Sequence, residues 1–176
     1  HSVTVEIDCS KAFKKAEGHS FFLYYLHASL VAANSVDAFK LRIEADEIWQ
    51  FEVIHASPTI NRPDGTFGFS YIDFYEDFET FEKFGKIEIE RVKNESGLIP
   101  AKAAANVIHY SVLPWLKFTG LSHARSFSYK DSCPKISFGK MDENFKMPVS
   151  ITVNHALVDG YHVAKFVEEF QKILNK

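Results

Sequence analysis

The chain has 176 residues and a mass of 20.1 kDa, and 46% of its residues are hydrophobic, so it can bury the core of one ordinary domain. Its net charge of −3 at pH 7 and its pI near 6.3 exclude a strongly basic surface and argue against nucleic acid as a partner. The apolar residues 21–33 are too few to span a membrane, so we expect no membrane partner. The two cysteines lack the spacing of a disulfide framework or a metal site, which favours a reducing cytoplasm. We therefore expect a single cytoplasmic domain over residues 1–176.

The first half of the chain predicts a strand, two helices and a hairpin. In chain order these are a strand over Ser2–Ile7, helices over Ser10–Lys15 and Phe21–Ala33, and hairpin strands over Leu41–Glu44 and Ile48–Val53. Ser20 is placed to cap the longer helix. Because the chain has no initiator Met and enters its first strand at once, we expect that an N-terminal segment is missing.

The second half contains more strands than helices. After a turn at Arg62-Pro63-Asp64-Gly65, the pattern predicts strands over Phe67–Phe74, Val107–Ser111, Arg125–Tyr129, Lys135–Met141 and Met147–Asn154, and helices over Phe78–Ser96 and Tyr161–Leu174. The apolar residues expected to turn the first of these helices toward the core are Phe81, Phe84, Ile87 and Val92. Because strands and helices do not alternate regularly, we predict an α+β fold, a two-layer sandwich of a mixed, largely antiparallel sheet covered by helices.

The most informative motif is the run His155-Ala156-Leu157-Val158-Asp159-Gly160, between the last strand and the last helix. A histidine among apolar residues is more often structural than functional. Here, however, an acid four residues on can order the local loop, and Gly160 lets the backbone turn tightly. An imidazole with its ordinary pKa of about 6.5 suits the removal of a proton from a hydroxyl. We therefore interpret His155 as a general base.

Other chemistries lack the residues that they need. No pair of His or Cys has the spacing of a zinc half-site, and no G-x-S-x-G elbow precedes the histidine. Phosphate-loop and dinucleotide fingerprints are also absent from the sequence. We therefore expect no metal cofactor and neither hydride nor phosphoryl transfer.

A second run, Ser111-Val112-Leu113-Pro114-Trp115, lies about forty residues upstream of His155. Taken alone, it is the end of a strand with an ordinary hydroxyl. Together with H-x-x-x-D-G before a final helix, this S-x-L-P-W run resembles the trimeric chloramphenicol acetyltransferase family, and the order of elements is similar over essentially the whole chain. H-x-x-x-D-G alone is shared with dihydrolipoyl acyltransferase catalytic domains and peptide-synthetase condensation domains, which have the same fold.

The resemblance implies an O-acetyltransferase that transfers acetyl from acetyl-CoA to a hydroxyl of chloramphenicol in a ternary complex and gives antibiotic resistance. It implies that His155 is the general base and that Ser111 donates a hydrogen bond to the oxyanion. Asp159 then has a structural role, supported in the family by an arginine that we place in the missing N-terminal segment.

Further positions follow from the same resemblance. Ser137 would hold a water near the transition state and Lys140 would approach coenzyme A, although a strand hydroxyl and a solvated edge charge are equally simple interpretations. The residues that match the acceptor pocket are Phe69, His109, Leu121 and His123. Because two of them are imidazoles, this pocket is more polar than the family leads us to expect, and the acceptor stays open.

The resemblance also implies a homotrimer with active sites between subunits. Two alternatives remain: a different small-molecule acceptor for the same acyl-CoA-dependent chemistry, and a noncatalytic trimeric ligand-binding homologue.

Overall fold

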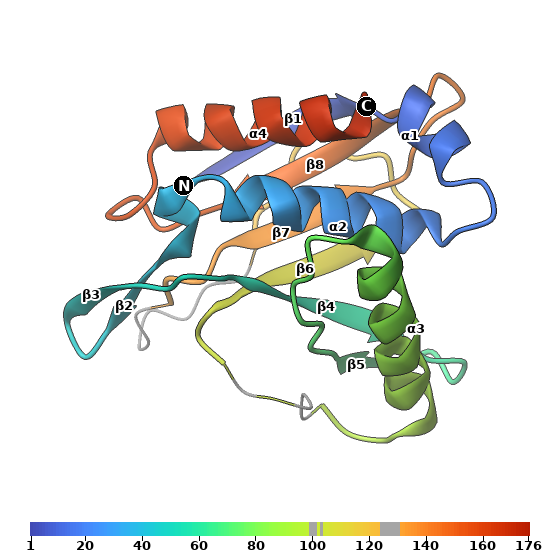
Figure 1. Ribbon diagram of the computed structural model, residues 1–176, viewed down its shortest axis with the longest axis horizontal. Helices are drawn as coiled ribbons and strands as arrows, with labels where there is room; N and C mark the ends of the chain where they lie inside the picture. Colours follow the sequence, from blue (N-terminus) through green and yellow to red (C-terminus); the bar gives the residue numbers. More distant parts are fainter. Residues whose placement is uncertain (99–101, 103, 124–130) are drawn as a thin grey trace.

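A six-stranded mixed sheet forms one layer of the structure, and helices form the other (Figure 1). The coordinates are a computed structural model that describes residues 1–98, 102, 104–123 and 131–176. The strands of the sheet, in the order in which they lie side by side, are β1 (Ser2–Asp8), β8 (Lys146–Thr152), β7 (Lys135–Gly139), β6 (Val107–Leu113), β4 (His55–Asn61) and β5 (Phe67–Phe69). The architecture confirms the predicted α+β class.

The helices and the separate hairpin agree closely with the sequence pattern. The helices are α1 (Ser10–Lys15), α2 (Phe21–Asn34), α3 (Phe78–Asn94) and α4 (Gly160–Leu174), with a 3-10 turn, η1 (Asp37–Lys40). The hairpin consists of β2 (Leu41–Glu44) and β3 (Glu47–Gln50), and β3 ends three residues before the predicted Val53. The predicted strand Arg125–Tyr129 lies outside the described residues. In the part of the chain that the structure describes, no helix is long and apolar enough to cross a membrane.

The two parallel pairings lie in the middle of the sheet. β6 runs parallel to both β4 and β7, whereas β1 with β8, β8 with β7, and β4 with β5 are antiparallel. The helices α2 and α4 lie side by side across one face of these strands (Figure 1).

The strand β4 is absent from our sequence-based prediction, and Pro58 stands in the middle of it. The Pro58 carbonyl accepts hydrogen bonds from the Ser70 backbone N–H at 3.1 Å and from Ser70 Oγ at 2.6 Å. Proline has no N–H with which to return a bond. The ladder between β4 and β5 is therefore interrupted beyond Phe69, and it reappears only as a bridge between Ala56 and Ile72. This is why β5 covers only Phe67–Phe69 of the predicted strand Phe67–Phe74.

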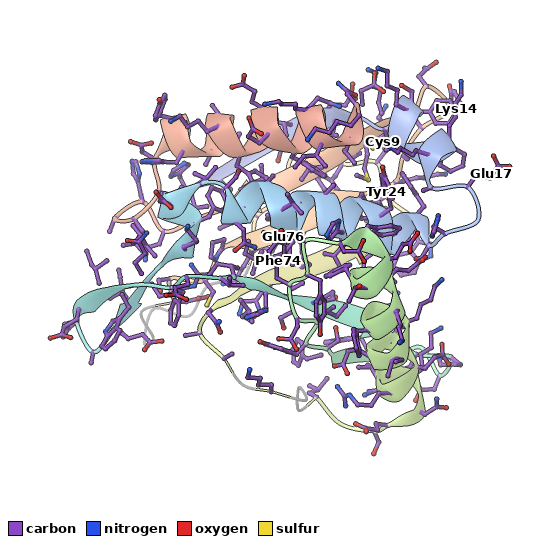
Figure 2. All side chains as sticks on the ribbon, viewed as in Figure 1. Cys9, Lys14, Glu17, Tyr24, Phe74 and Glu76 are labelled. Carbon is purple, nitrogen blue, oxygen red and sulfur yellow. The ribbon has the colours of Figure 1, made fainter. Side chains whose placement is uncertain are left out.

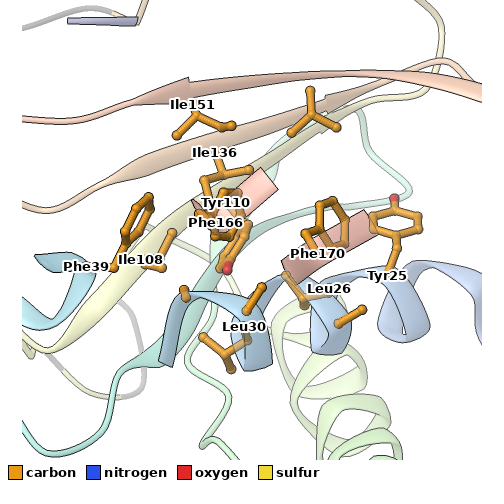
Figure 3. Packing of buried hydrophobic residues seen from close by; sticks show 14 of the residues in the cluster. Tyr25, Leu26, Leu30, Phe39, Ile108, Tyr110, Ile136, Ile151, Phe166 and Phe170 are labelled. Carbon is orange, nitrogen blue, oxygen red and sulfur yellow. The ribbon is translucent and has the colours of Figure 1, made fainter. Parts of the chain in front are cut away.

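Alternation along the central strands separates an apolar face from a polar one. The face toward the helices carries buried apolar side chains, which include Ile108, Tyr110, Ile136, Phe138, Val149 and Ile151. Figure 3 shows several of them against Leu26 and Leu30 of α2 and Phe166 and Phe170 of α4. The buried Tyr110 hydroxyl lies 3.2 Å from Ser29 Oγ, so its polar atom has a partner inside the core.

The buried face of α3 differs from the predicted one. Phe81 and Val92 are buried as expected, but Phe84 and Ile87 are 43% and 59% exposed. Glu82 and Gly85 take their place on the buried face. A Cβ at Gly85 would lie 2.8 Å from a Leu23 methyl group, so glycine allows α3 to approach α2 closely.

The carboxylate of Glu82 joins α3 to the start of α2. Its oxygens accept from the Ser20 N–H at 2.7 Å and lie 2.8 Å from His19 Nδ1 and 2.9 Å from Lys86 Nζ. Burial alone would raise the pKa of Glu82, but these hydrogen bonds outweigh it and lower the pKa to about 2.

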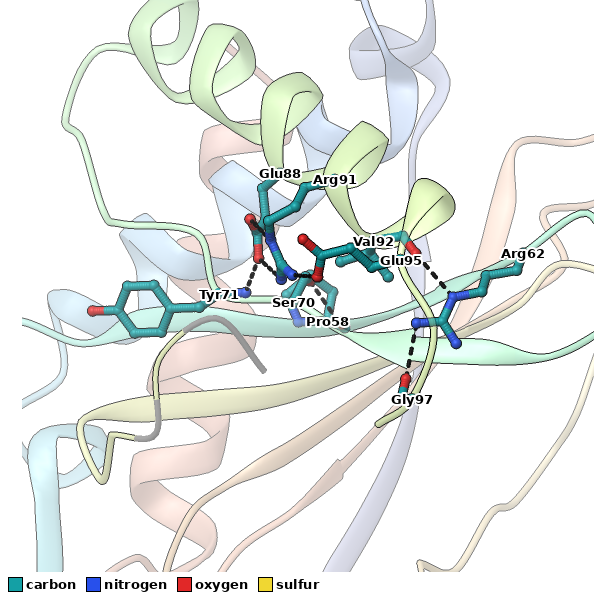
Figure 4. A network of polar contacts seen from close by, with 9 residues as sticks. All are labelled: Pro58, Arg62, Ser70, Tyr71, Glu88, Arg91, Val92, Glu95 and Gly97. Atoms are coloured by element: carbon teal, nitrogen blue, oxygen red, sulfur yellow. Dashed lines mark hydrogen bonds and ion pairs between the residues drawn. The ribbon is translucent and has the colours of Figure 1, made fainter. Parts of the chain in front are cut away.

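A second polar network joins the C-terminal end of α3 to the β4–β5 turn (Figure 4). The Arg62 guanidinium donates to the carbonyls of Val92, Phe67 and Gly97, each at 2.9 Å. Glu88 accepts from the Tyr71 N–H at 2.9 Å and pairs with Arg91. These contacts hold the short β5 beside the end of α3.

The two cysteines are free thiols. Cys9 is buried at the start of α1 (Figure 2), and burial raises the pKa of its thiol to about 12. Cys9 is therefore a packing residue with little thiolate at neutral pH.

We predict that Glu82→Gln lowers the free energy of unfolding by about 1–3 kcal/mol at pH 7, because a buried, charge-assisted set of hydrogen bonds is lost. A carboxylate with a depressed pKa stabilises the fold above its ordinary pKa of 4.5 and loses that contribution as pH falls toward 2. The difference between wild type and variant in urea unfolding should therefore shrink between these two pH values.

The matched control is Glu90→Gln on the same helix, where the carboxylate pairs with Lys93 in solvent. It should change stability by less than about 0.5 kcal/mol. If Glu82→Gln lost the same free energy of unfolding at pH 7 and at pH 2, the stabilising role of the charged Glu82 carboxylate would be contradicted.

Candidate active site

Hydroxyl side chains form a row on the face of the sheet opposite to the helices. Ser111 of β6 pairs in register with Ser137 of β7, which pairs with Ser150 of β8, which pairs with Thr4 of β1. Partners in register project from the same face of a sheet. The sheet therefore places the predicted oxyanion donor Ser111 directly beside Ser137.

The segment after Pro114 covers part of this row. Ser150 Oγ donates to the Leu121 carbonyl at 3.1 Å, and Ser137 and Ser150 are almost completely buried. Gly139 lies against this segment too, since a Cβ there would be 2.8 Å from the Phe118 ring. Leu121, a predicted acceptor contact, thus contributes its backbone to the support of the row.

His123 lies within hydrogen-bond distance of two hydroxyls on neighbouring strands. Its Nδ1 is 2.8 Å from Thr152 Oγ1, and its Nε2 is 2.7 Å from Ser137 Oγ. Loss of hydration on burial, together with the positive charge of Lys135, lowers the pKa of His123. The family resemblance implies different functions for His123 and Ser137, and the structure brings the two side chains into contact.

His155 lies in the turn between β8 and α4, exposed to solvent. The turn is anchored by the buried side chains of Leu157 and Val158 and by Asn154, whose carbonyl accepts from both of their N–H groups. The His155 Nδ1 lies 3.4 Å from the Val158 carbonyl, which favours a hydrogen on Nδ1 and leaves Nε2 free to accept a proton. Among the described residues, no hydrogen bond joins His155 to Ser111.

Asp159 caps helix α4. Its carboxylate accepts from the His162 N–H at 3.1 Å, and the Asp159 N–H donates in return to His162 Nδ1 at 3.3 Å, which completes a capping box. The hydrogen bond from the His162 N–H lowers the pKa of Asp159, so the carboxylate is charged at neutral pH. In the described part of the chain, the partner of Asp159 is therefore His162.

Two neighbouring cavities open on the polar side of the sheet. The larger, of about 430 Å³, is lined by His109 together with Arg42, Ile43, Glu44, Ala104, Ala105, Asp131, Ser132 and Cys133. The smaller, of about 30 Å³, is lined by His123, Asp131, Cys133, Lys135, Thr152, Val153 and Asn154. The cavities share Asp131 and Cys133, so the two predicted acceptor imidazoles line adjoining spaces.

The remaining predicted site residues are more scattered. Phe69 ends β5 and pairs with Thr59, so β4 separates it from Ser111. Lys140 follows β7 directly; its N–H donates to the Leu116 carbonyl at 2.8 Å, and the residue is exposed. Across the residues with defined positions, no group of three or more His, Cys, Asp or Glu could hold a metal ion.

A third cavity, of about 310 Å³, was missed by sequence analysis. It is lined by Phe22, Tyr25, Thr59, Ile60, Asn61, Ile89, Val112 and Pro114. These residues come from α2, α3, β4, β6 and the segment after β6, and the available signal was local: Val112 and Pro114 belong to the same run as Ser111. The cavity is mainly apolar, and its residues from α2 and α3 place it on the helix side of the sheet, so it suits a slender, largely apolar group on the face opposite to the Ser111 hydroxyl.

The family model described as "CAT: Chloramphenicol acetyltransferase" matches residues 1–171. A chloramphenicol acetyltransferase of Bacillus pumilus is 29% identical over 175 residues, covering 96% of this chain and 80% of the relative. One of Campylobacter coli is 26% identical, covering 100% of this chain and 87% of the relative.

Solved structures are similar over the whole fold. A chloramphenicol acetyltransferase structure, 27% identical, has a TM-score of 0.89 and covers 99% of this chain and 87% of that one. A probable dihydrolipoamide acetyltransferase from Listeria monocytogenes, 13% identical, has a TM-score of 0.67 and covers 99% of this chain and 83% of that one, which shows a shared fold alone.

We predict that Asp159→Ala lowers the midpoint of thermal unfolding, because α4 loses its N-cap and a favourable charge at its N-terminus. Asp159→Ser keeps a cap oxygen and should restore most of the loss. Calorimetry of the three proteins checks this, and equal midpoints for wild type and Asp159→Ala would contradict a capping role.

Proposed function

The chain belongs to the chloramphenicol acetyltransferase family and is an acetyltransferase, and on this premise we propose that it transfers acetyl from acetyl-CoA to a hydroxyl of chloramphenicol. The observation that carries the proposal is that the family match, over residues 1–171, includes both the Ser111–Trp115 run and the His155–Gly160 run. Such a reaction would protect a host against the antibiotic, in the cytoplasm where the drug acts.

The proposed reaction is a direct transfer in a ternary complex. His155 Nε2 takes the proton of the acceptor hydroxyl as that oxygen attacks the thioester carbonyl carbon. The carbonyl oxygen becomes an oxyanion, to which the Ser111 hydroxyl donates a hydrogen bond. Collapse of the intermediate breaks the carbon–sulfur bond, and the departing thiolate of coenzyme A receives the proton from the His155 imidazolium. In the described chain no serine or cysteine is hydrogen-bonded to His155, which supports transfer without an acyl-enzyme.

The apolar cavity beside Val112 and Pro114 supports the binding of a thioester arm. A pantetheine chain is slender and carries methylene and methyl groups around its two amides, and this cavity of about 310 Å³ lies at the C-terminal end of β6, past which the arm would turn to bring its thioester to the Ser111 face. In the proposal, Lys140 lies outside on the surface, where its charge can attract the phosphates of coenzyme A.

The acceptor is proposed to bind on the opposite side, next to the hydroxyl row. His109, Leu121 and His123 lie on that side of the sheet, and Phe69 extends it toward β5. Asp131 lines both cavities and Lys135 lines the smaller one, so both residues add charged groups there. This polarity favours, as the second candidate function, acetylation of a more polar small molecule by the same residues.

The proposed assembly is a homotrimer with the active site between subunits. One observation supports it: within one chain, His155 is exposed and makes no hydrogen bond to Ser111 among the described residues. A neighbouring subunit that brings its own Ser111 to His155 would complete the site.

A thiol-release assay with acetyl-CoA, run with and without chloramphenicol, tests the proposal. Release that depends on chloramphenicol supports it, and release with another hydroxyl compound alone favours the second candidate. No release with any acceptor would leave a noncatalytic ligand-binding protein.

We predict that His155→Ala lowers kcat by at least about a hundredfold, since a positioned general base typically contributes that much or more. The control is His19→Gln, which changes another imidazole at the start of α2 and should keep kcat near normal. Gel filtration should show the same oligomer for all three proteins. Near-normal turnover in His155→Ala would overturn the general-base assignment.

We predict that Ser111→Ala lowers kcat by about a hundred- to a thousandfold with little change in KM. The physical reason is that the oxyanion exists only near the transition state, so ground-state binding does not use the bond. Calorimetric titration with acetyl-CoA should give the same Kd for wild type and variant. A loss of affinity as large as the loss of rate would indicate a ground-state contact instead.

A further inference from the structure

We propose that His123 is a positioning residue that acts through Ser137, by orienting the Ser137 hydroxyl toward the oxyanion beside Ser111. The inference rests on the proposed function and adds a residue to it.

The contacts of His123 form the middle of a continuous chain of hydrogen bonds. Ser2 Oγ lies 2.7 Å from Thr152 Oγ1, which lies 2.8 Å from His123 Nδ1. His123 Nε2 lies 2.7 Å from Ser137 Oγ. The chain thus runs from the edge strand β1, through the end of β8 and the imidazole, to the middle of β7.

The part of this chain from Thr152 through His123 to Ser137 has only two consistent directions. The pKa of His123 is lowered, so at neutral pH the ring is neutral and carries one hydrogen, on Nδ1 or on Nε2. A hydroxyl can donate or accept, so each hydroxyl follows the choice that the ring makes. Between Thr152 and Ser137, either every group donates toward Ser137, or every group donates away from it.

The two directions have opposite effects on Ser137. If Nε2 carries the hydrogen, it donates to Ser137 Oγ, and the Ser137 hydrogen is free for another acceptor. If Nδ1 carries it, the Ser137 hydrogen is taken up by Nε2. Ser137 is only 1% exposed, so competing water is nearly excluded and the imidazole decides between the two.

The first direction serves the reaction. Ser137 and Ser111 are register partners on adjacent parallel strands, so their side chains share one face and extend from backbones about 5 Å apart. A second hydroxyl hydrogen aimed at the same oxyanion stabilises it further, directly or through one water. The other neighbour, Ser150, cannot do this, because its hydrogen is given to the Leu121 carbonyl.

The same contacts revise the assignment of His123 as an acceptor contact. Both ring nitrogens already have partners, so neither offers a free hydrogen bond to a bound acceptor. His123 is therefore placed to affect the rate of the chemical step more than the binding of the acceptor.

The test is a double-mutant cycle with His123→Leu and Ser137→Ala, assayed for acetyl transfer from acetyl-CoA to chloramphenicol. Each single variant should lower kcat about five- to tenfold and leave both KM values within about twofold. If His123 acts through Ser137, the double variant should be no slower than Ser137→Ala alone. His123→Gln should recover much of the rate, because its amide N–H can donate to Ser137.

Two results would overturn the inference: losses that multiply in the double variant, or a His123→Leu variant that raises the KM for chloramphenicol at unchanged kcat. Should His123→Leu fail to fold, Thr152→Val removes the hydroxyl that donates to Nδ1, and its smaller loss should vanish in the Ser137→Ala background. A wild type that transfers no acetyl would instead overturn the proposed function.

Nitrogen-15 NMR of the wild-type imidazole gives a readout that does not depend on activity. The expected signal is a neutral His123 ring with its hydrogen on Nε2, and the Nδ1-protonated ring would overturn the inference.

Discussion

The strict alternation of side chains along β6, β7 and β8 is the constraint on which the rest of the structure depends. One set of positions, represented by Tyr110 and Phe138, packs under α2 and α4. The other set must then face the opposite way, and it carries Ser111, Ser137 and Ser150. A slip of one residue in any of these strands would exchange the two sets, so the apolar core also determines where the hydroxyls lie.

The corner that carries His155 is held by different forces from those that hold the hydroxyl row. Buried Leu157 and Val158 anchor the turn, and the Asp159 cap fixes the start of α4. The imidazole is thus exposed on a rigid support, as a group that must meet a substrate requires. The proposed base and the proposed oxyanion donor therefore belong to two separately stabilised parts of the fold, as the proposed site between subunits requires.

Sequence patterns predicted the helices well because their signals are local. Ser20 and Asp159 cap α2 and α4 by bonds to residues three positions away. The pattern failed where a distant contact outweighed local preference. Pro58 argues against an interior strand, yet β4 forms, because Ser70, the residue after β5, donates to the Pro58 carbonyl and needs no N–H from proline. Apolar Phe84 and Ile87 were expected to be buried. However, the Glu82 carboxylate accepts a hydrogen bond from the Ser20 N–H at the start of α2, so α3 turns its Glu82 side toward the core instead.

By itself, the sequence determined the two motifs around Ser111 and His155, the resemblance that they carry, and the α+β class, because residue type and spacing along one chain define these. Only the tertiary structure decided that His123 meets Ser137, that His109 and His123 line adjoining cavities, and that a separate apolar cavity lies beside Val112 and Pro114. The physical reason is that each of these depends on how strands and loops far apart in the chain pack together. The spacing of residues along the chain does not reveal which distant residues meet, whereas burial and hydrogen bonds in the folded chain show it directly.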